Sequence, residues 1–172
     1  MSIRADYMGM PLSIDELDRE NLAFFQHCAA HDFHLQRCEG CNLLRYPPTT
    51  ACPWCMDQRA RWVAVEGKGV VHSYTEVHHA IQPAFKGLTP YLVLLVELDT
   101  QNGQPSEPEA LRVVGNLVTP AGTFADAETV RGVGIGTRVR MVFTDVAPGL
   151  ALPQWTIDEA AVVAQAWRYP QE

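Results

Sequence analysis

Basic side chains are scarce in this sequence, and lysine is almost absent. The chain has 13 lysine and arginine residues against 20 aspartate and glutamate residues, which gives a formal net charge of −7 at pH 7. Lys68 and Lys86 are the only lysines, and the arginines are scattered from Arg4 to Arg168 without forming a cluster. An acidic chain without a basic stripe is repelled by polyphosphate surfaces. We therefore expect no nucleic-acid partner.

Long apolar runs are missing as well. The longest, Tyr91–Val96, is far shorter than the roughly 20 residues that a membrane-spanning helix needs. The opening segment, MSIRADYMGMPLSIDELDRE, has neither the apolar stretch nor the small-residue cleavage site of a secretory signal. We expect a cytoplasmic protein with no membrane partner. In that reducing compartment, paired cysteines are more typical of metal binding than of disulfides.

The sequence also lacks recognisable catalytic motifs. The sequence contains no Gly-x-Ser-x-Gly nucleophile motif, no phosphate-binding Gly-Lys-Ser/Thr loop and no obvious acid/base pair. Gly132, Gly134 and Gly136 precede an expected strand, whereas the dinucleotide-binding fingerprint follows a strand and opens a helix. We therefore predict no catalytic residues in this chain.

The composition nevertheless indicates a folded protein whose first element is a helix. Hydrophobic residues make up 47% of the chain and charged residues 19%, which is enough for a real core. The pattern predicts an amphipathic helix from Ser13 to about His31, with Ser13 as N-cap and Glu16 completing a capping box. The apolar residues at helical spacing are Leu17, Leu22, Phe24, Phe25 and Cys28.

The second half of the chain reads as strands separated by Gly, Pro and Asn turns. Five runs rich in β-branched residues or alternating in polarity are Val63–His79, Tyr91–Asp99, Leu111–Thr119, Arg138–Val146 and Ala151–Ile157. Gly67 and Gly69 suit a bend in the first, and Asp126 is a candidate N-cap for a short helix over Phe124–Arg131. Five strands with an interposed helix predict an oligonucleotide/oligosaccharide-binding (OB) type barrel.

We therefore expect a mainly β fold in four segments. Residues 1–34 form an N-terminal helical segment, 35–62 a rubredoxin-like zinc ribbon, 63–157 a five-stranded OB-type barrel and 158–172 a C-terminal extension. Within the extension, Asp158–Trp167 is rich in Ala and Val. It is expected to form either a last helix or a tail that docks elsewhere.

Four of the five cysteines form two Cys-x-x-Cys pairs, Cys38/Cys41 and Cys52/Cys55. Each such pair presents two thiolates on one side of a tight turn, so two pairs complete the four-ligand shell that zinc prefers. A complete shell of thiolates leaves no open coordination position. The spacing therefore predicts a structural zinc ion, with iron in the same shell as the alternative metal.

The remaining cysteine and the histidines are weaker candidates. Cys28 lies on the apolar side of the expected helix, which favours a buried, inert thiol over a nucleophile. His27 and His31 are spaced for one helix face, with His34 nearby, but Cys follows His27 where a zinc protease has Glu. We interpret these histidines as surface or interface residues.

The loop after the first expected strand is a candidate binding segment. It contains His78, His79, Phe85 and Lys86 just before the next strand, and loops at a barrel mouth often carry binding residues. An ordinary polar connection is the equal alternative. Lys86 with Lys68 or Arg61 could meet a phosphate, although the sequence does not fix their relative positions.

Several motifs in one order resemble a known family. The cysteine motif LQRCEGCNLLRYPPTTACPWC is followed by WVAVEGKGVVHSYTEVHHAIQPAF, PYLVLLVELD, GNLV, GTRVRMVFTDV and LPQW. After an N-terminal helix, this order is similar to the zinc-ribbon/OB-fold proteins that accompany thiolases and other thiolase-like enzymes acting on acyl-CoA. The resemblance covers roughly residues 14–157.

The resemblance implies a non-catalytic subunit of a hetero-oligomer. In such complexes, the catalytic residues that make or break a carbon–carbon bond beside a CoA thioester belong to the thiolase-like partner. The implied cofactors are structural Zn²⁺ and a CoA or acyl-CoA shared with the partner, with His79, Phe85 and Lys86 as the candidate CoA or substrate loop. The chain departs from the family at Asn42 and Met56, where the ribbons often have Gly after each cysteine pair.

Three hypotheses follow. The first is an accessory subunit that shapes the active site of a thiolase-like partner and helps to bind CoA or substrate. The second is a nucleic-acid-binding zinc-ribbon/OB module, which the net charge of −7 opposes. The third is an acyl-CoA-binding protein that acts without an enzyme partner.

Overall fold

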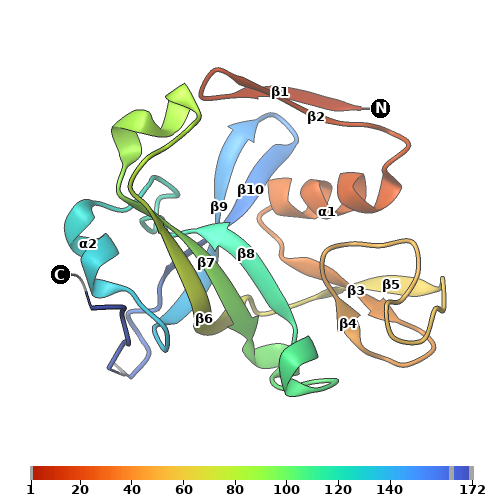
Figure 1. Ribbon diagram of the computed structural model, residues 1–172. Helices are drawn as coiled ribbons and strands as arrows, with labels where there is room; N and C mark the ends of the chain where they lie inside the picture. Colours follow the sequence, from red (N-terminus) through yellow and green to blue (C-terminus); the bar gives the residue numbers. More distant parts are fainter. Residues whose placement is uncertain (1, 163–164, 171–172) are drawn as a thin grey trace.

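Three sheets make up the fold of this computed structural model, which describes residues 2–162 and 165–170 (Figure 1). The first sheet pairs β1 (Ile3–Tyr7) with β2 (Met10–Ile14). The second has the order β4-β3-β5, made of β3 (His34–Cys38), β4 (Leu44–Arg45) and β5 (Ala60–Ala64). The third has the order β10-β9-β6-β7-β8, made of β6 (Lys68–Val77), β7 (Tyr91–Leu98), β8 (Arg112–Asn116), β9 (Arg138–Ala147) and β10 (Leu150–Ile157).

Helices are short and few in the described residues. The α-helices are α1 (Arg19–Ala29) and α2 (Ala127–Gly132), and the 3₁₀ turns are η1 (Pro83–Leu88), η2 (Asp99–Gln101) and η3 (Glu107–Glu109). None of these helices is long and apolar enough to cross a membrane. The mainly β class with an N-terminal helix, a ribbon and a five-stranded OB-type barrel is thus confirmed.

The N-terminal segment differs from the sequence expectation. The helix begins at Arg19, and its N-cap is Asp18, whose side chain accepts from the backbone N–H of Asn21. Ser13 instead lies in β2, opposite Arg4 of β1. Residues 10–14 form a strand because half-buried and exposed positions alternate along them, as they do along residues 3–7. This period of two matches a hairpin rather than a helix.

The first expected strand is two strands. Gly67 has φ of +69° and breaks the run, so Val63 belongs to β5 and pairs with Leu35 of the ribbon sheet, while β6 begins at Lys68. The other four barrel strands and the short helix are confirmed within a few residues. Asp126 accepts from the backbone N–H of Thr129 as the expected N-cap of α2.

The barrel closes between its outer strands and surrounds one apolar core. Leu117 forms an isolated parallel bridge with Trp155 of β10, and the backbone N–H of Asn116 donates to the side chain of Gln154. Trp155 is fully buried. Gly115 permits this packing because a Cβ there would lie 2.9 Å from the indole ring.

Helix α1 lies against β10 and joins the barrel to the ribbon (Figure 1). Its buried residues are Phe24 and Cys28. The ring of Phe24 contacts Phe33, which precedes β3, and Tyr46, which follows β4, at centroid distances of 6.5 and 5.8 Å. The amphipathic helix expected from the sequence therefore covers a surface of the same chain.

The C-terminal segment docks as a tail in its described part. Trp167 exchanges two backbone hydrogen bonds with Ile135, and Arg168 pairs with Glu76 of β6 and donates to the carbonyls of Val130 and Val133. Gly134 makes room for this pairing, because a Cβ there would lie 2.2 Å from the carbonyl oxygen of Trp167. The expected helix over Asp158–Trp167 is absent from the described residues, and residues 163–164 lie outside them.

Gly69 offers a test of the close approach between β6 and β7. A Cβ at this position would lie 2.2 Å from the carbonyl oxygen of Glu97, and backbone atoms cannot move aside without disturbing the sheet. We expect Gly69→Ala to lower the free energy of unfolding by about 1–3 kcal/mol or more in denaturant titrations. Gly87→Ala is the matched control, since no atom lies within 4 Å of its Cβ position. Equal stabilities of the two variants would contradict this reading.

Candidate metal centre and barrel surfaces

The four paired cysteines converge at one end of the ribbon. All four sulfur atoms lie within 4.8 Å of one another, with 3.4 Å between Cys38 and Cys55 and 3.5 Å between Cys41 and Cys52. These distances are too long for a disulfide bond of about 2.05 Å. The two close contacts are slightly shorter than the sulfur–sulfur edge of about 3.8 Å expected for a tetrahedron with metal–sulfur bonds of about 2.3 Å.

Two equivalent turns hold the sulfurs in place. In the first, Asn42 donates to the carbonyl of Cys38 at 3.1 Å, and in the second, Met56 donates to the carbonyl of Cys52 at 3.0 Å. Both donors have φ of +62°. The left-handed turn that often carries Gly therefore forms with Asn and with Met at these positions.

Backbone donors favour thiolates at one cysteine of each pair. Burial raises the pKa of Cys52, but the N–H groups of Cys55 and Trp54 outweigh it and bring the pKa down to about 6. The N–H of Cys41 likewise holds the pKa of Cys38 below its ordinary value, against the effect of burial. Amide groups directed at sulfur are an arrangement suited to anionic ligands.

The other two thiols show why a cation is needed. The N–H of Leu43 lowers the pKa of Cys41, yet burial and the neighbouring sulfurs together raise it to about 12. The N–H of Asp57 lowers the pKa of Cys55, but contact with Cys38, burial and contact with Cys52 together raise it above its ordinary value. Four neighbouring thiolates repel one another, and a divalent cation offsets this repulsion by binding them in deprotonated form. The four cysteines are thus suited to hold a metal ion.

A buried glutamine fastens the ribbon to the barrel. The side chain of Gln101, after β7, accepts from the backbone N–H of Leu44 at 2.7 Å and donates to its carbonyl at 3.1 Å. Leu44 is buried in the common core. Sequence reasoning missed this contact, because no local pattern distinguishes Gln101 from other polar residues in the β7–β8 loop.

The segment expected to bind CoA lies on η1 and its approach. Phe85 belongs to an aromatic cluster in which its ring contacts Tyr7, Tyr91 and Phe124 at centroid distances of 5.7 to 6.3 Å. His79 and Lys86 are exposed. Of the other cations considered with Lys86, Lys68 pairs with Glu66 and Arg61 is exposed. The structure therefore places Phe85 in a packed cluster and leaves the two basic side chains at the surface.

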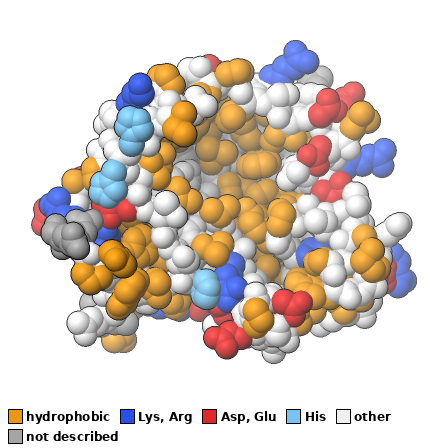
Figure 2. Space-filling model, viewed as in Figure 1, with side chains coloured by type: hydrophobic (Ala, Val, Ile, Leu, Met, Phe, Trp, Pro, Cys, Tyr) orange, Lys and Arg blue, Asp and Glu red, His pale blue; other side chains and the backbone are white. Residues whose placement is uncertain are grey.

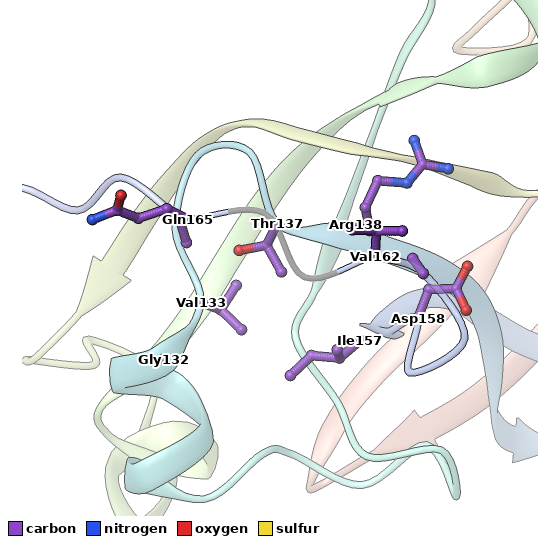
Figure 3. A pocket seen from close by; sticks show the side chains of 10 residues that line it. Gly132, Val133, Thr137, Arg138, Ile157, Asp158, Val162 and Gln165 are labelled. Atoms are coloured by element: carbon purple, nitrogen blue, oxygen red, sulfur yellow. The ribbon is translucent and has the colours of Figure 1, made fainter.

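A cavity of about 400 Å³ lies between the start of β9, the end of β10 and the C-terminal segment (Figure 3). Its lining includes Val133, Thr137, Ile157 and Asp158. Arg138 also borders it, but its guanidinium points away in Figure 3 and pairs with Asp99. This lining lacks a nucleophile paired with a base.

The face shown in Figure 2 is hollowed below the β1–β2 hairpin, with hydrophobic side chains on its floor. The outer side of β6, β7 and β8 carries the aliphatic residues Val93, Leu95 and Val114 among the polar residues Ser73, Thr75 and Asn116. Leu95 of β7 lies opposite Ser73 and Val114, and Val93 lies opposite Thr75. A shallow cavity of about 250 Å³ lies over these residues.

Comparison with known proteins identifies the family of the chain. Residues 62–144 match the family description "ChsH2, C-terminal OB-fold domain". Among solved structures, a chain of the "Ltp2-ChsH2(DUF35) aldolase" is 31% identical with a TM-score of 0.63, and the match covers 84% of this chain and 98% of that chain. The chain belongs to the ChsH2/DUF35 OB-fold family.

Two curated relatives are also similar to this ChsH2/DUF35 chain. A "Probable enoyl-CoA hydratase alpha subunit" of Thermomonospora curvata is 34% identical over 137 residues, which are 80% of this chain and 37% of that protein. A "DUF35 domain-containing scaffold protein" of Methanothermobacter thermautotrophicus is 29% identical over 111 residues, 64% of this chain and 70% of that protein. The chain thus spans little more than a third of the first relative's length.

The remaining sequence candidates do not join the cysteines. Burial raises the pKa of Cys28 to about 12, which agrees with an inert thiol. His27 stacks on His34 at 4.2 Å and contacts Trp62, whereas His31 lies beyond α1 and pairs with Asp145 at 2.7 Å. In the described part of this DUF35-family chain, the four cysteines are the one group of three or more potential ligands close enough to hold a metal ion.

The left-handed turns give a prediction about residue preference. Asn adopts positive φ more readily than Met, and Met56 is 72% exposed, so its side chain contributes little packing. We expect Met56→Asn to raise the free energy of unfolding of the metal-loaded protein by about 0.5–1 kcal/mol. The reciprocal change Asn42→Met should lower it by a similar amount. Denaturant unfolding at saturating zinc checks both, and shifts of the opposite sign would refute the explanation.

Proposed function

We propose that the chain is a non-catalytic, zinc-binding OB-fold subunit of a thiolase-like complex that makes or cleaves a carbon–carbon bond in an acyl-CoA. It helps to shape the active site and to bind CoA or substrate. The observation that carries this proposal is the likeness over 98% of a chain of an aldolase complex.

The metal is proposed to be Zn²⁺, held by Cys38, Cys41, Cys52 and Cys55. Four sulfur ligands leave no position for a substrate, so the ion stabilises the ribbon instead of activating water. Iron remains the alternative, because it accepts the same ligands. The two Cys-x-x-Cys turns, joined through the metal ion, then close one end of the ribbon.

The aliphatic patch of Val93, Leu95 and Val114 on the outer face of β6, β7 and β8 favours a protein or acyl partner over nucleic acid. OB-folds that bind single strands combine basic grooves with stacking aromatics on this face. Here Val93, Leu95 and Val114 take those positions, and the whole chain carries a net charge of −7. A nucleic-acid-binding module is therefore the poorer explanation.

The CoA or substrate loop is proposed to include His79, Phe85 and Lys86. Lys86 offers a cation for a phosphate, and the aromatic cluster around Phe85 fixes the turn that presents it. Acyl-CoA shared with the partner would then lie along η1. We place the complex in the cytoplasm, where reducing conditions keep the cysteines available to metal.

Serine substitutions test the metal site. Cys38→Ser or Cys55→Ser is expected to lower zinc content and soluble yield together, because metal-binding energy is folding energy for so small a ribbon. Elemental analysis of the purified protein measures zinc per chain. Cys28→Ala is the control and should retain zinc, since Cys28 lies outside the cluster. Normal zinc content and normal melting in both serine variants would exclude the four-cysteine site.

Co-purification tests the partner. The tagged chain is expressed with the thiolase-like protein encoded beside it, and complex formation and turnover of a CoA thioester are measured. We expect a stable complex whose activity requires both proteins. A monomer that leaves the partner's activity unchanged would instead direct attention to the third hypothesis, an acyl-CoA-binding protein, and to binding assays with CoA esters and single-stranded nucleic acid.

A further inference from the structure

Arg45 is a buried cation in the ribbon. It is the second residue of β4 and only 2% exposed. Its Nε donates to the side-chain oxygen of Gln36 at 3.0 Å, and one terminal nitrogen donates to the carbonyl of Thr49 at 2.9 Å. Arginine is seldom buried unless it is paired, so its position calls for an explanation beyond packing.

The partners of Arg45 lie shortly before each of the two cysteine pairs. The side-chain oxygen of Gln36, two residues before Cys38, also accepts from the backbone N–H of Thr49 at 2.9 Å. The hydroxyl of Thr49 in turn donates to the carbonyl of Ala51 at 2.8 Å. Ala51 directly precedes Cys52. One buried network therefore connects the approach to the first cysteine pair with the approach to the second.

No hydrogen bond of Arg45 reaches an anion, and the carboxylate that interacts with its charge, Asp57, is itself paired with Arg59. Both of its hydrogen-bond acceptors are neutral oxygens. Its other terminal nitrogen, Nη1, is buried without a hydrogen-bond partner among the residues that the structure describes. Burying a cation with only neutral partners is unfavourable, so a compensating negative charge in the ribbon would stabilise it.

A metal ion bound by the four cysteines would supply a further negative charge. Four thiolates around a divalent ion would leave an excess of two negative charges in the same ribbon, and opposite charges attract strongly through a medium of low dielectric constant. Groups that orient or balance metal ligands without touching the ion commonly change metal affinity by about 10–100-fold when replaced.

We propose that Arg45 is a positioning residue for the metal centre. It holds the second cysteine pair against the first through Gln36 and Thr49, and it offsets the negative charge of the tetrathiolate. This inference rests on the proposed four-cysteine metal site. It extends that site to a residue whose place in the sequence, between the two motifs, gives no sign of such a role.

Zinc affinity measured on the purified, metal-loaded full chain tests the inference. Competition with a chromophoric chelator gives the dissociation constant for wild type, Arg45→Met and Arg45→Lys. We expect Arg45→Met to bind zinc about 10–100-fold more weakly. Arg45→Lys should lie between it and wild type, because lysine keeps the charge but lacks the planar fork that reaches Gln36 and Thr49 together.

Two further measurements separate this role from general stability. Arg61→Met removes an exposed arginine of the same ribbon and should leave zinc affinity unchanged. Cobalt substitution reports the ligand geometry directly, and we expect the thiolate-to-cobalt absorption of Arg45→Lys to differ from that of wild type. This conservative variant keeps the test valid if Arg45→Met does not fold.

The role of Arg45 can be overturned by two results. Wild-type affinity and an unchanged cobalt spectrum in Arg45→Lys, together with wild-type affinity in any folded Arg45→Met, would overturn the inference even if melting temperatures fell. An equal loss of affinity in Arg61→Met would also overturn it, since any ribbon cation would then suffice. If wild type itself binds neither zinc nor cobalt, the four-cysteine site fails, which is distinguishable from a failure of Arg45 alone.

Discussion

The convergence of four sulfur atoms is the constraint on which the ribbon and its neighbours depend. The three-stranded sheet includes a strand of two residues, β4, and has little apolar surface that it could bury alone. Yet its strand β3 supplies Leu35 to the common core, and its strand β5 leads directly into β6 of the barrel. Whatever fixes the cysteine turns therefore also fixes where α1 packs and where the barrel begins.

The sequence could predict those features whose physical cause is local. Two Cys-x-x-Cys pairs predict the cluster of four sulfur atoms because each pair is a single turn, and the alternating runs predict the barrel strands because strand side chains have a period of two. Asp126 was identifiable as an N-cap for the same reason. In these cases, the residues that determine the structure lie within a few positions of one another.

Features that depend on distant partners were missed or misplaced. The end of β2 is predicted as the start of a helix, since Ser13 and Glu16 satisfy a capping pattern that the pairing of Ser13 with Arg4 overrides. Gln101 and Arg45 look like ordinary loop and strand residues until Leu44 and Gln36 are brought beside them. The spacing of Gly134 from its neighbouring glycines could suggest a nucleotide-binding motif. In the structure, glycine is required there because the backbone of Trp167 passes too close for a Cβ atom.

The bidentate contact of Gln101 has a consequence for self-association. β4 is an edge strand of the three-stranded sheet, and open edges can recruit strands from other molecules. The amide of Gln101 occupies both the N–H and the carbonyl of Leu44, the groups that an incoming strand would use. A single side chain thus closes this edge against intermolecular strand addition, and with it one route to fibrous aggregates.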